Sequence, residues 1–211
     1  MAGCDEVGIG PLAGPVVAAT VILDPDSVGK QRSRSKWWYR VRDSKTTNEK
    51  ERQNLVNFIK DHCLDYAVGI VGNETIDEIN IHQAAMLAME KSVMSLKTEP
   101  DFLFLDGIHK IKRSHVPQQT VTDGDVKILS IAAASIVAKV ARDEILTQLH
   151  QQFPQYGFVK HKGYGTMAHR IALKKFGVSP VHRKSFTFVK EVLKQFWSIR
   201  NFEKLYLGEV A

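Results

Sequence analysis

The sequence predicts an α/β fold in which a mixed β-sheet is flanked by helices and followed by a helical C-terminal extension. Three observations lead to this prediction: strand-like segments open the chain, helical and strand-like segments alternate in its middle, and helical segments end it. At 211 residues, with 44% hydrophobic and 25% charged residues, the chain can bury a full core. This composition excludes the collagen-like, disordered and disulfide-scaffold classes.

The N-terminal segment predicts two strands joined by a glycine-rich loop. The first strand ends near Glu6, because residues 5–15 contain three glycines and two prolines. Val16–Leu23 is apolar and rich in β-branched residues, which is typical of a buried strand. Residues 24–42 are rich in Lys, Arg and Ser and hold Trp37 as well as other aromatics, so they predict a basic surface loop or hairpin.

Two Thr-x-x-Glu capping boxes predict helices in the middle of the chain. The box that starts at Thr46 predicts a helix over about residues 47–62, and the box at Thr75 opens a helical stretch that reaches about Leu96. Between them, Tyr66–Val71 is expected to be a strand.

A short apolar run, Phe102–Leu105, predicts a central strand with Asp106 at its C-terminal end. Gln119–Thr122 is expected to form one more short strand, closed by a turn at Asp123–Asp125. The remaining helical patterns cover residues 130–153, 166–176 and about 188–206.

Charge and cysteine content bear on compartment and partners. The chain has 29 Lys and Arg against 23 Asp and Glu, a net charge of +6, which is a weak hint of a polyanionic partner. Two cysteines fit a reducing compartment. The sequence shows neither a membrane span nor a secretory signal. We therefore expect a cytoplasmic monomer without a membrane partner.

Four acidic residues stand next to apolar structure: Asp5, Glu6, Asp106 and Asp143. A carboxylate near a core needs a partner, and no single cationic residue recurs beside all four. A divalent cation would be a suitable shared partner, since Mg²⁺ binds a few carboxylates together with waters and substrate phosphate. Taken singly, each acid also fits an N-cap, a strand-end Asp or a helix surface. Adjacent strand residues face opposite ways, so Asp5 and Glu6 can share a metal only if the strand ends between them or Glu6 offers its carbonyl.

A second group of candidate residues is basic. Residues 158–184 contain no acid, and their cations are interleaved at the start with aromatic residues, a combination that suits a nucleic-acid backbone and its bases. The cations are Lys160, Lys162, Arg170, Lys174, Lys175, Arg183 and Lys184, and the aromatic residues are Tyr156, Phe158 and Tyr164. A solvated helix face remains the alternative.

The glycines of the loop Gly8-Ile9-Gly10 would let main-chain groups approach a ligand closely. Backbone groups can hydrogen-bond the ribose 2′-hydroxyl that distinguishes RNA from DNA. A tight turn that feeds the second strand is equally compatible with these three residues.

Together, these segments resemble ribonuclease HII, the type 2 ribonuclease H. The resemblance starts at residues 5–16 (DEVGIGPLAGPV) and extends in order over nearly all of residues 3–190. Its further motifs are residues 43–45 (DSK), 76–80 (IDEIN), 105–107 (LDG), 130–139 (SIAAASIVAK), 142–143 (RD), 156–158 (YGF), 162–166 (KGYGT), 179–183 (SPVHR) and 185–186 (SF).

The resemblance implies a ribonuclease H-like fold and endonucleolytic cleavage of RNA in RNA/DNA hybrids and at ribonucleotides embedded in duplex DNA. It implies two Mg²⁺ or Mn²⁺ ions, one orienting the attacking water and one stabilising the leaving 3′-oxygen, and products with 5′-phosphate and 3′-hydroxyl ends. The implied metal-binding and catalytic residues are Asp5, Glu6, Asp106 and Asp143, and the implied substrate-binding residues are Gly8, Ile9, Gly10, Ser44, Lys45, Lys162 and Tyr164. Residues 1–190 would form the catalytic domain with its helical substrate-binding portion, and residues 191–211 a C-terminal helix and tail.

Two departures from the family pattern leave alternatives open. Ile9 stands where the family ordinarily has arginine, which suggests a hybrid-binding protein with weak or altered cleavage as the second hypothesis. Residues 29–42 and Thr46–Asn48 also depart from the usual pattern. A third hypothesis, a ribonuclease H-like DNA-strand transferase, is disfavoured by the ordered series of motifs.

Overall fold

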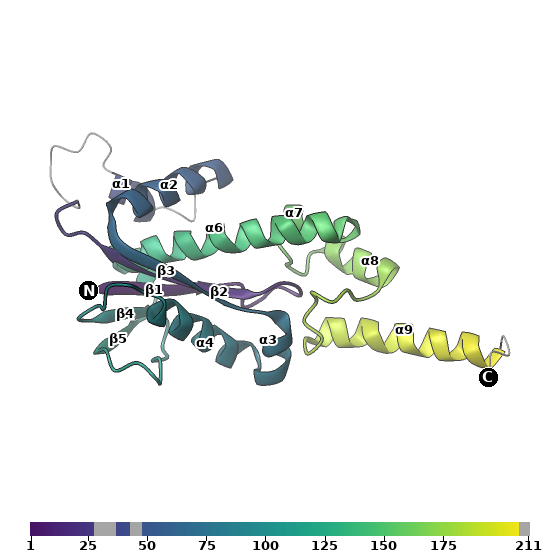
Figure 1. Ribbon diagram of the computed structural model, residues 1–211. Helices are drawn as coiled ribbons and strands as arrows, with labels where there is room; N and C mark the ends of the chain where they lie inside the picture. Colours follow the sequence, from purple (N-terminus) through teal and green to yellow (C-terminus); the bar gives the residue numbers. More distant parts are fainter. Residues whose placement is uncertain (28–36, 43–47, 207–211) are drawn as a thin grey trace. The chain divides into compact units, whose positions relative to one another are not determined.

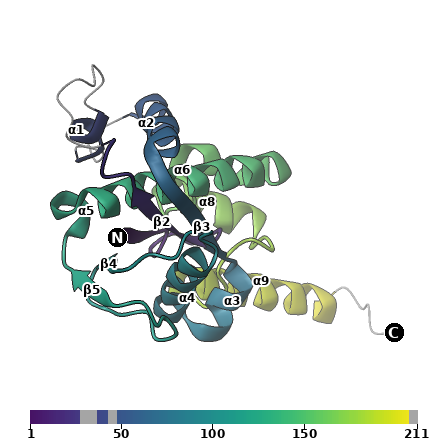
Figure 2. The same cartoon turned by 60° about the vertical axis from the view of Figure 1, so that its left-hand side comes forward.

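The computed structural model describes residues 1–27, 37–42 and 48–206, and in this part of the chain five strands form one mixed sheet. The strand order is β3-β2-β1-β4-β5 (Figures 1 and 2). Antiparallel pairing joins β1 to β2 and β2 to β3, whereas β4 pairs in parallel with both β1 and β5. The strands are β1 (Ala2–Val7), β2 (Val16–Leu23), β3 (Cys63–Val71), β4 (Leu103–Asp106) and β5 (Gln118–Val121). The predicted mixed sheet is confirmed.

Helices account for most of the remaining described residues. They are α1 (Trp37–Arg42), α2 (Glu49–His62), α3 (Asn73–Ile79), α4 (Ile81–Met94), α5 (Gly124–Lys127), α6 (Leu129–Gln152), the 3₁₀ turn η1 (Pro154–Tyr156), α7 (Phe158–His161), α8 (Met167–Phe176) and α9 (Thr187–Tyr206). The expected C-terminal helices thus correspond to α6, α8 and α9, with boundaries within one residue of the prediction.

The chain divides into two compact units, of which the first holds the sheet and comprises residues 1–9, 15–71 and 81–142. Helix α4 packs against β1, β2 and β3 on one face of this sheet, and the first half of α6 covers the other face (Figure 1). Glycines permit both contacts: a Cβ on Gly69 would lie 2.0 Å from the Ala88 carbonyl oxygen, and one on Gly3 would lie 2.3 Å from the Ile131 nitrogen. The Ala132–Ala134 run of α6 is buried, as close helix-to-sheet packing requires.

The second unit comprises residues 10–14, 72–80 and 143–211. Its core is an apolar cluster around Leu146, Phe158 and Leu173, and it also includes the loop residues Leu12 and Ala13. The loop is held by backbone bonds on two sides, because Leu12 donates to the Gly163 carbonyl at 2.8 Å and accepts from the Arg183 amide at 2.8 Å.

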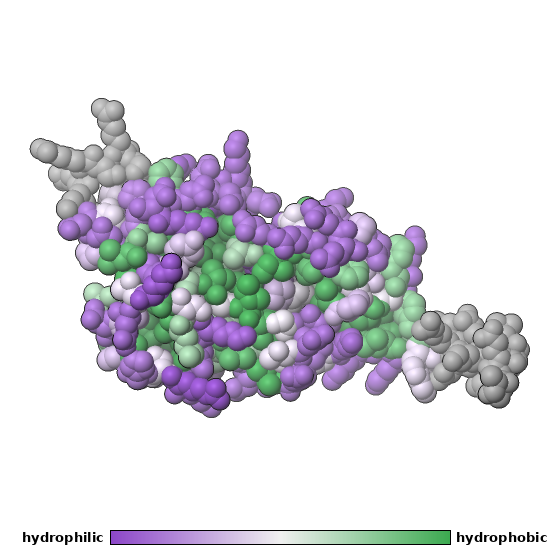
Figure 3. Space-filling model, in the orientation of Figure 1, coloured by the Kyte–Doolittle hydropathy of each residue, from purple (hydrophilic) through white to green (hydrophobic). Residues whose placement is uncertain are grey.

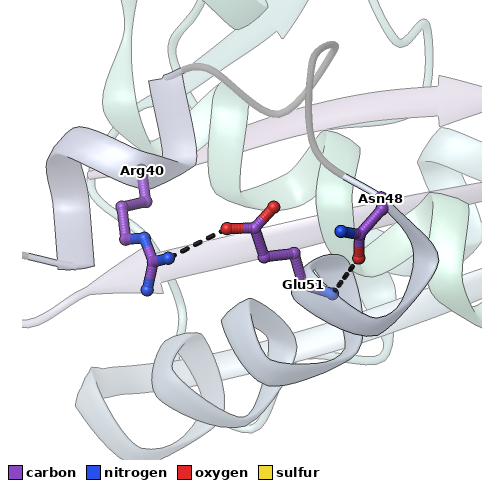
Figure 4. A network of polar contacts seen from close by, with 3 residues as sticks. All are labelled: Arg40, Asn48 and Glu51. Carbon is purple, nitrogen blue, oxygen red and sulfur yellow. Dashed lines mark hydrogen bonds and ion pairs between the residues drawn. The ribbon is translucent and has the colours of Figure 1, made fainter.

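The start of α2 differs from the prediction. Its N-cap is Asn48, whose side-chain oxygen accepts from the Glu51 amide at 2.9 Å, and Arg40 of α1 forms an ion pair with the Glu51 carboxylate at 2.9 Å (Figure 4). Thr46 lies outside the described residues. Hydrophilic residues cover the outer side of α2, as the purple surface there shows (Figure 3).

Three further expectations need correction. Residues 37–42 form the helix α1 and not a loop or hairpin. The helical stretch predicted from Thr75 is two helices, because Asn80 adopts a φ of 68° that no α-helix continues through. Gly124 and Asp125 of the turn expected at residues 123–125 are instead the first two residues of the short helix α5, and Asp123 precedes them at a φ of 54°.

No helix among the described residues is long and apolar enough to cross a membrane.

Candidate active site

The C-terminal ends of the parallel strands β1 and β4 bring three of the predicted acids into one region. The two strands pair with Cys4 opposite Leu105, so that Asp5 and Asp106 follow at the next position of each strand. Asp5 lies on the α6 side of the sheet, where it accepts a hydrogen bond from the Ser135 hydroxyl. Because side chains alternate between the faces of a strand, the neighbouring Glu6 starts from the opposite face.

Backbone amides orient two of these carboxylates. The Glu6 amide donates to Asp5 Oδ1 at 2.7 Å, and the Gly124 amide donates to Asp106 Oδ1 at 2.7 Å. A side chain at position 124 would displace its neighbours, because a Cβ there would lie 2.6 Å from Ile131 Cδ1 and 3.1 Å from Asp106 Oδ1. The turn after β5 therefore fixes the carboxylate at the end of β4.

The electrostatics of this region disfavour ionisation of Asp5 and Glu6. Burial raises the pKa of Asp5 to about 8, a shift opposed by the Ser135 hydrogen bond and increased by the charges of Glu6 and Asp106. Burial and the charge of Asp106 raise the pKa of Glu6 to about 7. No Lys or Arg among the described residues forms an ion pair with any of the three acids. When these carboxylates are ionised, no side-chain cation in the described part of the chain is paired with them to balance their negative charge.

These residues fit a divalent cation. Carboxylate oxygens are the hard ligands that Mg²⁺ and Mn²⁺ prefer, and a bound cation would favour the ionised carboxylates against the burial and the like charges that raise the two pKa values. In the described part of the chain, no group of three or more His, Cys, Asp or Glu side chains is arranged so that it could hold an ion by itself. Mg²⁺ commonly binds one or two carboxylates and completes its shell with waters and substrate phosphates, which is compatible with this cluster.

Asp143, the fourth predicted acid, lies on α6 in the second unit. It follows Ser135 by eight residues, about two helical turns, and so lies on the stripe of α6 that Ser135 begins. The Asp143 side chain is buried at 6% exposure. Its role as a metal ligand stays a prediction.

A buried arginine supports the start of the glycine loop. Gly8 has a φ of 98°, and a Cβ there would lie 2.3 Å from Arg142 Nε, so only glycine fits. The Arg142 side chain is fully buried and donates from Nε to the Pro15 carbonyl at 3.0 Å. Ile9 follows as a half-buried residue.

In the second unit, the end of the same loop lies beside an aromatic ring. A Cβ on the exposed Gly10 would lie 3.8 Å from Tyr164 Cε1, and Tyr164 itself is 42% exposed. Lys162, two residues before Tyr164, is half-buried and adopts a φ of 50°, the left-handed conformation that side chains rarely take. The second unit therefore presents an exposed aromatic ring, Tyr164, next to the glycine Gly10 and two residues after the cation Lys162.

The basic segment is only in part a charged surface. Lys160, Arg170, Lys174, Lys175 and Lys184 are exposed. Arg183 is fully buried instead, where its Nε donates to the Gly14 carbonyl at 3.0 Å and its guanidinium lies 5.2 Å from the centre of the Phe186 ring. Arg183 is therefore a core residue, not a surface cation. Ser44 and Lys45 lie outside the described residues.

The sequence predicted no supporting role for the residues that hold the acids and the Tyr164 loop, although Ser135 shares a helical stripe with Asp143. Ser135 and Gly124 orient Asp5 and Asp106, and the spacing of Ser135 from Asp143 was the available signal for the first of them. Histidines support the Tyr164 loop, and the signal was their concentration in the acid-free segment, in which three of the eight fall.

Comparisons with known proteins agree on one family. The family model for ribonuclease HII matches residues 2–189. A ribonuclease HII from Endomicrobium trichonymphae is 49% identical over 195 residues, which cover 92% of this chain and 89% of that protein. The crystal structure of the ribonuclease H2 from Pyrococcus horikoshii OT3 has a TM-score of 0.77 at 24% identity, covering 93% of this chain and 98% of that one. Bst-RNase HIII in complex with Mn²⁺ has a TM-score of 0.67 at 19% identity, covering 92% of this chain and 69% of that one.

The structural similarities place the fold among the ribonuclease H-like proteins, as predicted. The sequence similarities go further, and the chain belongs to the ribonuclease HII family. It is therefore an enzyme, a metal-dependent endonuclease and phosphodiester hydrolase with ribonuclease H activity on RNA/DNA hybrids.

Proposed function

We propose that this ribonuclease H cuts the RNA strand of hybrids and also cuts at single ribonucleotides embedded in duplex DNA. In this proposal Asp5, Glu6, Asp106 and Asp143 hold two Mg²⁺ or Mn²⁺ ions. The observation that carries it is the group of three carboxylates at the ends of β1 and β4, in which Asp5 is buried and Glu6 and Asp106 are half-buried, and which has no ion-pair partner among the described residues. The Mn²⁺ complex of the structurally similar ribonuclease HIII supports the class of metal.

The protein's own residues hold and orient the charge that the reaction needs. When bound, two divalent ions activate a water for in-line attack and offset the charge on the leaving 3′-oxygen. The Ser135 hydroxyl and the Glu6 amide hold the Asp5 carboxylate, while the Gly124 amide holds that of Asp106. Preorganised ligands of this kind lower the cost of assembling the reacting groups. The products carry 5′-phosphate and 3′-hydroxyl ends.

Substrate reading is assigned to the glycine loop and to the 162–164 loop. The backbone of Gly8, Ile9 and Gly10 contacts the 2′-hydroxyl of the ribonucleotide, which makes the cut specific for RNA. The Tyr164 ring packs on the nucleotide at the RNA-to-DNA junction, as its exposure allows. Lys162, Ser44 and Lys45 contact phosphates.

One cleavage assay tests this proposal. Three end-labelled duplexes are compared with Mg²⁺, with Mn²⁺ and with chelator: a full RNA/DNA hybrid, a DNA duplex with one ribonucleotide, and an all-DNA duplex. We expect metal-dependent cuts in the first two and none in the third. Products with 3′-phosphate or cyclic phosphate ends, or cleavage that persists in chelator, would exclude the two-metal mechanism.

The alternative of hybrid binding with weak or altered cleavage, which Ile9 suggested because it lacks the family's cation, is not favoured by the membership of the chain in the ribonuclease HII family. The same assay separates the two candidates when it is paired with a binding measurement. Tight binding of the hybrid without metal-dependent cuts would support the second candidate and overturn the first.

A further inference from the structure

Three histidines of the second unit form one group of contacting rings, in which His161 is half-buried. The rings of His161 and His169 stack with their centres 4.4 Å apart and an angle of 14° between the planes. His169 Nε2 lies 3.0 Å from His182 Nε2, and both of these residues are fully buried. The Phe158 ring packs against all three histidines. Nothing in the proposed chemistry uses these imidazoles.

The hydrogen bonds determine which nitrogen of each ring carries the proton. The Ser179 amide donates to His182 Nδ1 at 3.0 Å, and because an amide can only donate, this nitrogen has no proton. The proton of the neutral His182 ring is therefore on Nε2, from which it is donated to His169 Nε2. His169 must then carry its own proton on Nδ1, which donates to the Tyr164 carbonyl at 3.0 Å.

His161 is fixed in the same way. The Gly163 amide donates to His161 Nδ1 at 3.3 Å, which leaves the proton on Nε2, where it is donated to the Tyr156 carbonyl at 2.8 Å. The two stacked rings thus bind the two ends of the Gly163–Tyr164 dipeptide: His161 accepts from the Gly163 amide, and His169 donates to the Tyr164 carbonyl. The Gly163 carbonyl accepts in turn from the Leu12 amide at 2.8 Å.

We propose that His161, His169 and His182 are positioning residues, whose directed chain of hydrogen bonds holds the 162–164 loop so that Lys162 and Tyr164 meet the nucleic acid. The loop needs such support, because Lys162 is held at a φ of 50°. The inference rests on the proposed function for the role of Lys162 and Tyr164, but the direction of the chain stands without it. Burial lowers the pKa of His169 to about 4 and that of His182 to about 3, so both rings are neutral at pH 7.

The direction of the chain is tested on the full-length wild-type protein by NMR of ¹⁵N-labelled histidine at pH 7. We expect the Nδ1–H tautomer for His169 and the Nε2–H tautomer for His161 and His182. An Nε2–H tautomer for His169, or a doubly protonated ring at any of the three positions, would overturn the proposal. This measurement requires neither substrate nor metal.

The positioning role is tested with two substitutions of one residue. In His169→Asn, the side-chain amide takes the place of Nδ1 and can still donate to the Tyr164 carbonyl. In His169→Gln, the amide reaches the place of Nε2 instead and keeps only the contact with His182. Comparing the two variants therefore distinguishes the effect of the hydrogen bond to the Tyr164 carbonyl from the effect of filling the space of the His169 side chain.

We expect His169→Gln to raise KM for the hybrid about fivefold with kcat unchanged, and His169→Asn to stay within about twofold of wild type, because one hydrogen bond to the loop distinguishes them. Equal thermal unfolding midpoints show that both variants are folded. Equal KM values for the two variants would make His169 a packing residue only and overturn the proposal. A wild-type protein that cleaves no hybrid would instead refute the proposed function, and the tautomers would still decide the direction of the chain.

Discussion

Two groups of titratable residues with buried members invite comparison: the carboxylates at the ends of β1 and β4, and the histidines of the second unit. Each is assembled from distant segments and each has strongly shifted pKa values. In the histidine group, all six ring nitrogens have a hydrogen-bond partner. In the carboxylate group, Asp5 receives two donors but faces the charges of Glu6 and Asp106.

The difference separates a ligand site from a support. The histidine group is complete as it stands, because neutral imidazoles need only hydrogen bonds. The carboxylate group retains like charges that hydrogen bonds do not cancel, and a cation would complete it. Burial and a shifted pKa are common to both groups and therefore do not by themselves indicate a binding site. The feature that indicates a cation site is the negative charge of the carboxylates, which no side-chain cation balances.

The largest expected effect tests the carboxylate side of this comparison. Asp106→Asn removes one ligand charge at nearly constant volume, so cleavage of the hybrid should fall by at least about a thousandfold, equivalent to about 4 kcal/mol of transition-state stabilisation. Hybrid binding and the unfolding midpoint should stay near wild type. The measurement is single-turnover cleavage at saturating Mg²⁺.

Asp101→Asn is the matched control, since Asp101 is an exposed acid that precedes the other end of β4. Its cleavage rate should equal that of the wild type. A wild-type rate from Asp106→Asn would remove Asp106 from the site.

The next effect is on stability, and pH should act on the two groups with opposite sign. Because the pKa of Asp5 is raised to about 8, its contribution to stability is full below about pH 4 and is lost as pH rises through 8. Because the pKa of His169 is lowered to about 4, its contribution is full above about pH 6.5 and is lost as pH falls through 4. The two groups therefore favour opposite ends of this range.

Urea unfolding in chelator measures both signs. At pH 8, Asp5→Asn should be more stable than the wild type by about 2 kcal/mol, because the variant has no buried charge at that position. Added Mg²⁺ should stabilise the wild type and not the variant. His169→Asn should flatten the loss of stability between pH 6.5 and 4. A wild type that is the more stable protein at pH 8 in chelator would show that the ionised Asp5 carboxylate does not destabilise the fold.

The parts of the fold that follow local patterns were predictable from the sequence. Val16–Leu23 forms a strand with the predicted bounds, because a β-branched apolar run between proline and polar residues has few other structures. Asp106 ends β4, as the apolar run before it indicated. Both features depend on neighbours in the sequence.

Features that depend on distant contacts were not predictable. The break at Asn80 requires a positive φ within a segment of good helix formers. Arg183 belongs to a basic run, yet its guanidinium is buried against Phe186 by the fold. The histidine group needs three segments to meet, which no spacing along the chain reveals.

The third prediction concerns Ile9, which follows Gly8, the glycine that packs on Arg142. An arginine at position 9 adds a charge-assisted hydrogen bond near the reacting phosphate, worth about 1.5–3 kcal/mol if well placed, while burial of a cation at this half-buried position opposes it. We expect Ile9→Arg to raise cleavage at a single embedded ribonucleotide by about tenfold, and more than cleavage of a continuous hybrid. Ile9→Lys is the control for charge without the guanidinium geometry. Equal responses of both substrates would show that residue 9 does not read the junction.

The smallest expected effect is on the salt dependence of hybrid binding, and it concerns Lys162 in the 162–164 loop that the histidines hold. Lys162→Ala keeps the β-carbon, and with it the backbone conformation, while it removes the charge. Each neutralised phosphate releases condensed counterions, so the slope of log affinity against log salt should decrease by about 0.9. Binding is measured with chelator present to prevent cleavage.

Lys174→Ala is the matched control, because Lys174 is an exposed cation of the same acid-free segment on α8. If both variants lower the slope equally, the contribution of Lys162 is general surface charge, and the support of its loop by the histidines has no bearing on phosphate binding. A decrease confined to Lys162→Ala, and reproduced by His169→Gln but not by His169→Asn, would connect the neutral histidine chain to one phosphate contact.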